Sequence, residues 1–278
     1  MAVQEQDTSQ LGGAVPAAGR RKGGWRRRID PGSIGLFVVS IAAGLLAWQL
    51  ISLQYSATFL PSPSETWAGA RDLAEDGTLW DSVVASSRRI MVGWGLGLVV
   101  GIPVGLLMGR FSIVRRLLDP YIEFFRFIPP IAFVTLAVIW LGVGESSKVV
   151  LIFYTTVFIV TLNTIAGVLA VDEAKLRAAE SLGANKLQIM QSVVVPASVP
   201  YMVTGARLAM GNSFLTIVSA EIVAAQEGLG ALIWTSRNYG RTEWVFVGIV
   251  ALGILGFLFD RVIRYLSKTF LGRYAVKV

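Results

Sequence analysis

Polar side chains that stand inside long apolar segments are the residues of this sequence best able to carry chemistry. Arg126 and Arg207 carry guanidinium groups that could attract an anion, and Glu221 carries a carboxylate. Asn163 and Asn212 add amides. Because burying such groups costs free energy, they are kept for a function or for an internal partner. They are candidates for lining a path, in which the two arginines could attract an anion. A structural ion pair or a contact with a backbone carbonyl is the more frequent role of such an arginine, and a hydrogen bond between helices is the more frequent role of an asparagine such as Asn163.

Cysteine and histidine are both absent from the 278 residues. Their absence excludes thiolate and imidazole metal sites, disulfides, catalytic cysteines and Ser-His-Asp triads. The glycine-containing segment 142–148 is not a P-loop, because Ser147 stands where Gly must precede the lysine and Val149 stands where Ser or Thr must follow it. We therefore expect a chain that is not an enzyme and that binds no metal and no cofactor.

The composition indicates a membrane protein. Hydrophobic residues make up 54% of the chain and charged residues only 15%, whereas a soluble domain has about 25% charged residues. The charges are clustered, and the gaps between clusters reach the roughly 20 residues that a helix needs to cross a bilayer. We predict an all-α membrane protein whose domain covers 34–272, with the third helix kinked at its proline pair. The six predicted spans are 34–53, 84–109, 120–141, 149–171, 199–222 and 244–266.

The distribution of lysine and arginine predicts the orientation. Of the 25 basic residues, 17 fall in the N-terminal stretch, the C-terminal end and the loops 110–118 and 172–198. Six are assigned to the opposite side of the membrane, among them Arg88 and Arg89 near the start of the span 84–109, and Arg126 and Arg207 remain within spans. Basic residues favour the cytoplasmic side, so both termini are expected there. We expect 1–33 to be a disordered basic tail that touches anionic lipid, and 273–278 to be a short cytoplasmic tail. The net charge of +7 is thus assigned to membrane orientation rather than to nucleic acid.

Glycines recur at every fourth position of the second predicted span. Such a stripe lets another helix approach closely, so we predict a packing seam rather than a binding site. The glycines are Gly93, Gly97, Gly101, Gly105 and Gly109.

The loop 172–198 is both long and patterned. Asp172 favours a helix start, and Gly183 favours its end. Asn185 followed by Gln188 has the spacing of a capping box for a second short helix, which Pro196 is expected to end. We predict a helix-turn-helix that docks a partner; a hairpin lying on lipid headgroups is the alternative.

This loop resembles the EAA motif of permease subunits in binding-protein-dependent ABC importers. The motif reads E-A-A-x3-G-x9-I-x-L-P, and here Arg177 stands in place of its glutamate, with Val193 and Val195 in place of its Ile and Leu. The resemblance implies the type I ABC importer permease fold and a loop that inserts into a cleft of the ATPase subunit. The ATPase-coupling residues that it implies are Arg177, Ala178, Ala179, Gly183, Ala184, Asn185, Val193 and Pro196.

Further segments are similar to the nitrate/sulfonate/taurine group of these permeases. They are Pro-Pro-Ile-Ala-Phe at 129–133, the stretch 140–148, Ala-Glu at 220–221 and Gly-Leu-Gly at 228–230, with Phe133 where most members have Trp. The resemblance implies a small, anionic solute. The translocation pathway candidates are Arg126, Pro129, Pro130, Phe133, Asn163, Arg207, Asn212 and Glu221.

The resemblance also implies the partners and the location. It implies a homodimer in the lipid of a bacterial inner membrane, two ATPase subunits that use ATP and Mg²⁺, and an extracytoplasmic substrate-binding protein. The main alternative is an ion-coupled secondary transporter, which would work alone. Such transporters usually keep titratable groups within the membrane, and only Glu123 and Glu221 stand near span ends here. A membrane-bound enzyme is a weaker alternative, because no acid, base or metal-ligand cluster is recognisable.

Overall fold

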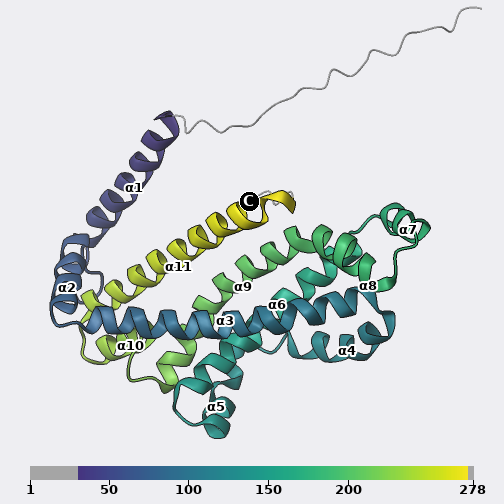
Figure 1. The fold of residues 1–278 in the computed structure, drawn as a ribbon. Helices are drawn as coiled ribbons and strands as arrows, with labels where there is room; N and C mark the ends of the chain where they lie inside the picture. Colours follow the sequence, from purple (N-terminus) through teal and green to yellow (C-terminus); the bar gives the residue numbers. More distant parts are fainter. Residues whose placement is uncertain (1–30, 275–278) are drawn as a thin grey trace, which may run out of the picture. The chain divides into compact units, whose positions relative to one another are not determined.

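The computed structural model describes residues 31–274, and all regular structure in that range is helical (Figure 1). The chain divides into two compact units, Met1–Leu46 and Ala47–Val278. The helices are α1 (Pro31–Ser52), α2 (Pro63–Glu75), α3 (Thr78–Arg110), α4 (Ser112–Phe125), α5 (Pro130–Leu141), α6 (Glu145–Leu169), α7 (Glu173–Ser181), α8 (Lys186–Ile189), α9 (Val195–Ala224), α10 (Leu229–Asn238) and α11 (Thr242–Leu271). A π-helical turn, Met190–Val194, joins α8 to α9, and a 3₁₀ turn, Gly272–Tyr274, follows α11.

The expected tails fall almost entirely outside the described residues. Of 1–33, only 31–33 are described, and they already belong to α1, so the helix begins three residues before the expected boundary. Of 273–278, residues 273 and 274 belong to the 3₁₀ turn. The predicted disorder therefore stays a prediction for 1–30.

α1 has the length and composition of a membrane span. Its 22 residues carry no charge and reach about 33 Å, which matches the hydrocarbon thickness of a bilayer. Its last residues lie in the second unit, where the Trp48 indole N–H donates to the Pro61 carbonyl over 3.0 Å and the ring stacks on Phe246.

The core of the second unit is the packing of α3, α6 and α9 (Figure 1). The central cluster contains Ile90 from α3, Ile152 from α6 and Met210 from α9. α6 and α9 run in opposite directions. The end of α6 and the start of α9 lie at one end of the bundle, where α7 and α8 connect them, and the start of α6 (Glu145) and the start of α10 (Leu229) lie at the other end. We call these the α7 end and the α10 end.

The glycine stripe of α3 is a packing seam, as predicted. A Cβ at Gly93 would lie 2.6 Å from the Cβ of Ile152, and one at Gly105 would lie 2.6 Å from the Cβ of Thr164. Gly97, Gly101 and Gly109 meet α6 in the same way. A later glycine of α3 meets a later residue of α6: Gly93 meets Ile152, and Gly105 meets Thr164. The two helices therefore run parallel.

The third predicted span is a sharply bent pair of helices rather than a kinked helix. α4 begins at Ser112, eight residues before the expected start, and α4 and α5 meet at 97°. Pro129 and Pro130 lack backbone N–H groups and push the preceding residues out of the helical conformation, so residues 126–129 form a break. The Tyr154 hydroxyl donates to the carbonyls of Phe125 and Ile128 and so satisfies acceptors that the break leaves open.

The helix after the α7 turn continues through Pro196, which was expected to end it. α8, the π-helical turn and α9 form one apolar stretch, Lys186–Ala224. Pro196 lacks an N–H and its ring crowds the carbonyl one turn earlier. A π turn widens the helix at the point where Pro196 enters, so the backbone accommodates the ring without ending the helix.

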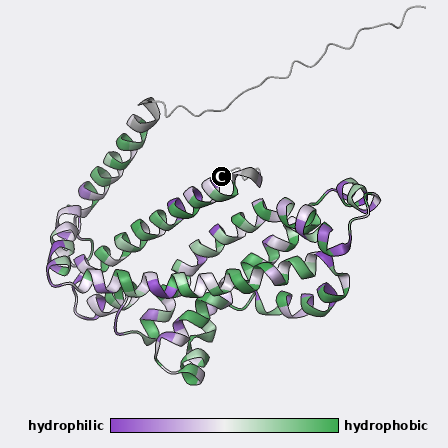
Figure 2. Cartoon of the chain, viewed as in Figure 1, coloured by the Kyte–Doolittle hydropathy of each residue, from purple (hydrophilic) through white to green (hydrophobic). Residues whose placement is uncertain are grey.

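Two helices were not predicted as parts of the bundle. α10 follows Gly228 and packs on α9 and α11. α2 precedes α3; Ser62 is its N-cap and forms a capping box with Glu65. Within residues 31–274, five helical stretches have the length and hydropathy of membrane spans, and the bent pair α4–α5 makes a sixth if it crosses as one unit. Figure 2 shows hydrophobic residues along α11 and hydrophilic ones gathered at α7.

Candidate functional site

The predicted helix-turn-helix is present at the α7 end. The Asp172 carboxylate caps α7 by accepting from the Ala174 N–H over 2.8 Å. Asn185 caps α8 through the expected capping box, in which the Gln188 N–H donates to Asn185 Oδ1 over 2.9 Å. Between them Gly183 adopts φ +81°, a left-handed conformation that favours glycine. A Cβ at Gly183 would meet no atom within 4 Å, so the turn depends on backbone conformation rather than on space.

A small apolar cluster holds this turn against the transmembrane helices. Val168 at the end of α6, Ile189 of α8 and Val194 of the π turn are buried together, and Leu176 and Ala179 of α7 pack on them. The position of α7 is therefore set by the ends of α6 and α9 rather than by a separate domain.

A groove, which we call the α7 groove, lies between α7, the π turn with the start of α9, and the 3₁₀ turn at the end of α11. It has a volume of about 580 Å³. Its lining residues are Lys175, Ala178, Ala179, Leu182, Ser192, Val193, Pro196, Ala197 and Tyr274. Four of the predicted coupling residues line it, namely Ala178, Ala179, Val193 and Pro196.

The other predicted coupling residues surround the groove without lining it. Gly183 and Asn185 shape the turn, and Ala184 packs below it. Arg177 is exposed and approaches Glu173 only to 4.0 Å, so its guanidinium remains accessible to a partner.

Two leucines at this turn are exposed to solvent. Leu182 is 88% exposed and Leu187 is 64% exposed. Leu182 is the C-cap of α7 and Leu187 is in the first turn of α8, so both lie at the α7 end of the bundle rather than along its apolar sides. Large apolar side chains gathered beside a groove are typical of a protein contact surface.

The two arginines predicted for the solute path are each paired with a carboxylate. Arg207 Nε donates to Asp260 Oδ1 of α11 over 3.0 Å. Arg126 donates to Glu123 Oε2 over 2.7 Å at the α4–α5 break and lies over the Phe127 ring. The ion-pair alternative therefore describes the observed state of both.

Glu221 is the centre of a buried network at the α10 end. It is 0% exposed, and Arg89, 4% exposed, donates to it over 2.7 Å. Ser86 Oγ and the Gly230 N–H also donate to its carboxylate. Gly228 has φ +125° and lies directly against the carboxylate, where a Cβ would overlap it. Glu221 thus joins α3, α9 and α10.

The network extends to α6 through Arg89. Its guanidinium donates to both oxygens of Glu145, over 2.9 and 2.6 Å, and to the carbonyl of Glu227 over 2.7 Å. Arg88 also pairs with Glu145, and Lys148 is buried beside it. Sequence reasoning missed Arg88, Arg89, Glu145 and Lys148 as site residues because it assigned the basic ones to loops. The signal that could have found them is their position: Arg88 and Arg89 directly precede the uncharged segment 90–109, and Glu145 and Lys148 stand just before the uncharged segment 149–171.

The remaining candidates lie in separate places. The Asn163 amide donates to the carbonyl of Ile159 in its own helix, and its side chain packs against Gly205 of α9. Asn212 is exposed on α9. Phe133 packs against the Tyr154 ring at 4.9 Å, close to the break at Pro129. The structure therefore distributes the eight pathway candidates over several contacts and does not bring them together at one site.

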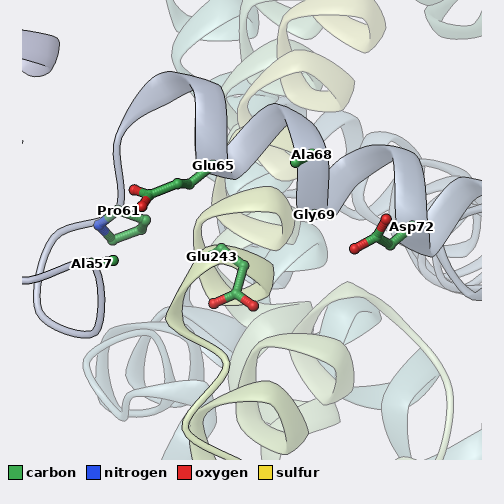
Figure 3. A pocket seen from close by; sticks show the side chains of 7 residues that line it. All are labelled: Ala57, Pro61, Glu65, Ala68, Gly69, Asp72 and Glu243. Carbon is green, nitrogen blue, oxygen red and sulfur yellow. The ribbon is translucent and has the colours of Figure 1, made fainter.

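Two further cavities lie at the α10 end. One, of about 380 Å³, borders the Arg89 network. The other, of about 340 Å³, lies between α2 and the start of α11, and Figure 3 shows Glu65, Asp72 and Glu243 around it. Within residues 31–274 no group of three or more carboxylates lies close enough to hold a metal ion.

Several long apolar helices and the tight seam between two of them define a multi-pass membrane protein. Residues 101–271 match the family described as "Binding-protein-dependent transport system inner membrane component". The chain belongs to this family and is a transport component of the inner membrane.

Similar proteins agree with this family. A probable ABC transporter permease protein of Brucella melitensis is 39% identical over 83% of this chain and 94% of its own. The taurine transport system permease protein TauC of Escherichia coli is 37% identical over 83% and 88%. The bicarbonate transport system permease protein CmpB of Synechococcus elongatus is 31% identical over 88% and 91%.

A solved structure supports the fold. The MetNI methionine ABC transporter in an inward facing conformation matches with a TM-score of 0.58 at 19% identity, over 68% of this chain and 96% of that chain. The predicted type I importer permease fold is thereby confirmed.

Proposed function

We propose that this chain is the membrane-spanning subunit of an ATP-driven importer and that 172–198 couples it to a separate ATPase. The observation that carries the proposal is the α7 turn with Leu182 exposed beside an apolar groove. The EAA-like spacing and the family support it. The proposed coupling residues are Ala178, Ala179, Val193 and Pro196, which line the groove, together with Arg177, Gly183, Ala184 and Asn185, which shape or flank it.

The continuous helix Lys186–Ala224 suggests how a displacement at the groove would be transmitted. Its 39 residues reach about 58 Å, longer than the bilayer is thick. One end carries a wall of the groove, and the other is held to Arg89 through Glu221. A push on α8 would therefore tilt α9 as a lever and alternate access to the pathway. ATP and Mg²⁺ act on the partner ATPase, and this chain binds no cofactor.

We propose a small, anionic solute of the sulfonate, taurine or nitrate kind. Relatives named for taurine and bicarbonate transport support this class. An anion would have to displace Asp260 from Arg207, or Glu123 from Arg126, to reach either guanidinium. We keep all eight pathway candidates that the sequence suggested. Of those on α9, Asn212 is the exposed one.

We further propose a homodimer in the lipid bilayer, with both termini cytoplasmic. The α7 groove of each copy then faces one of the two ATPase subunits. The α10 end of each copy faces the extracytoplasmic substrate-binding protein. The family description, a binding-protein-dependent system, supports these partners.

The test is assembly with a separately encoded ABC ATPase. The purified chain should hydrolyse no ATP by itself and should bind that ATPase stoichiometrically. Leu182→Asp should weaken the affinity at least about tenfold, because it places a charge in an apolar contact. The matched control is Tyr239→Asp, which changes a side chain 77% exposed at the α10 end and should leave the affinity unchanged.

Two results would contradict the proposal. One is stable, ATP-independent uptake by the purified chain in liposomes, which would favour an ion-coupled secondary transporter. The other is equal loss of ATPase binding in both variants, which would show that exposure alone, rather than the α7 turn, governs assembly.

A further inference from the structure

We infer that the end of α11 belongs to the docking site and that Tyr274 contacts the ATPase partner. This inference rests on the proposed function. Tyr274 lines the α7 groove together with Ala178 and Leu182 of the α7 segment, although it follows α11 and is far from α7 in the sequence. The docking site thus has a third side, formed by Tyr274, in addition to α7 and the segment 192–197.

The chemistry of the groove describes the segment that would occupy it. Ala178, Ala179 and Ala197 leave room because their side chains are small, and Val193 and Pro196 are apolar. Among the described residues that line the groove, Lys175 is the only charged one. The structure therefore fits an apolar segment of the ATPase that carries a carboxylate near Lys175. Tyrosine suits such a contact, since its large ring covers apolar surface.

A contact at Tyr274 would bring α11 into the coupling. Asp260 of α11 accepts from Arg207 of α9 over 3.0 Å and from Arg264 of its own helix over 3.0 Å. This ion pair ties α11 to α9 within the bundle. A displacement at the groove would then move α9 and α11 as a pair, rather than α9 alone.

Affinity for the ATPase tests the role of Tyr274. Tyr274→Ala should weaken binding about tenfold, because aromatic anchors carry a large share of interface energy, and Tyr274→Phe should stay within about twofold of wild type. The matched control is Tyr265→Ala, on α11, which precedes the 3₁₀ turn; this side chain is 70% exposed and outside the groove lining, so the variant should bind as wild type.

Thiol labelling gives an independent readout. Because the chain contains no cysteine, Tyr274→Cys creates a single reactive thiol without further changes. Added ATPase should slow the labelling of this thiol by a water-soluble maleimide about tenfold or more, as an O-ring of contacts excludes water from an interface core. Thr78→Cys, exposed at the α10 end, should label at the same rate with and without ATPase.

The outcomes separate this inference from the proposed function. The inference is overturned if Tyr274→Ala binds as wild type or if the ATPase leaves labelling at position 274 unchanged, while Leu182→Asp still loses binding. If neither Leu182→Asp nor Tyr274→Ala weakens binding, the proposed function fails as well.

Discussion

Gly183 makes the turn between α7 and α8 possible through its backbone alone. Its φ of +81° lies in the left-handed region, which costs an ordinary L-residue about 1–2 kcal/mol. Asparagine tolerates this region better than other residues, whereas β-branched residues avoid it. Since no atom lies within 4 Å of a Cβ at this position, volume is not the constraint.

We therefore expect Gly183→Asn to transport nearly as wild type and Gly183→Val to lose coupling. The valine should destabilise the turn by about 1–2 kcal/mol and displace α7 from the groove wall. The measurement is solute taken up per ATP hydrolysed, in proteoliposomes that contain the assembled importer.

Gly144→Val is the matched control for this prediction. Gly144 also has open space around it but has φ −68°, which any residue adopts, so the ratio should not change. Equal uptake per ATP in Gly183→Val and wild type would remove the left-handed turn from the coupling mechanism.

The sequence predicted the individual residues of the α7 turn but not the partners of the buried charges. Asn185 and Gln188 are three residues apart, so a local pattern predicts their capping box. Glu221 was predicted to line a path because it ends an apolar segment. Its partner Arg89 lies 132 residues earlier, and counting basic residues by loop placed Arg89 outside the membrane helices. Pairing at that separation is a property of the packed bundle, which no local pattern contains.

At the scale of elements, the seam between α3 and α6 was predictable and its register was not. The four-residue spacing of the glycines predicts a flat helix face. It does not name α6 as the partner, nor the side chains that fill each gap. At Gly93 the neighbours are the Ile152 side chain and the Val149 carbonyl, which would lie 2.8 Å from a Cβ. A backbone atom cannot rotate away, so the seam tolerates no added methyl group there.

We predict opposite effects for two neighbouring glycines of α3. Gly93→Ala should destabilise the protein by about 1–3 kcal/mol, because overpacking forces the helices apart. Gly95→Ala should leave stability unchanged or raise it by up to about 1 kcal/mol, since a Cβ there meets nothing within 4 Å and alanine favours helix. The measurement is the thermal unfolding midpoint of each variant in the same detergent. Equal midpoints in the two variants would contradict the close approach of α3 and α6.

Two elements departed from their predicted form for one physical reason. Proline predicts a disturbance in a helix but not its size. At 126–129 two consecutive prolines, with Tyr154 to satisfy the freed carbonyls, give a 97° break. At Pro196 a π turn accommodates the ring, and the helix continues. The surrounding side chains decide between these results, so the sequence around each proline was not sufficient to predict them.

For the whole molecule, the number of membrane crossings decides whether the termini share a side. Five helices qualify as spans, and α4–α5 either crosses as a sixth or returns to the side where it began. The parallel seam distinguishes these possibilities. Because α3 and α6 run in the same direction, the end of α3 and the start of α6 lie at opposite ends of the bundle. The chain between them must therefore travel the length of the bundle, and only α4–α5 is available to do so.

We accordingly predict that the two ends of α4–α5 face opposite sides of the membrane. Ser112→Cys and Val143→Cys each place a single thiol at an exposed position, one before α4 and one after α5. In intact cells with an impermeant maleimide, Val143→Cys should label at once, and Ser112→Cys should label only after the inner membrane is opened. That pattern gives six crossings, places both termini together and, with 17 of 25 basic residues on their side, makes that side cytoplasmic. Labelling of both thiols from outside would instead make α4–α5 re-entrant, and α3 and α6 could then not run parallel across the membrane.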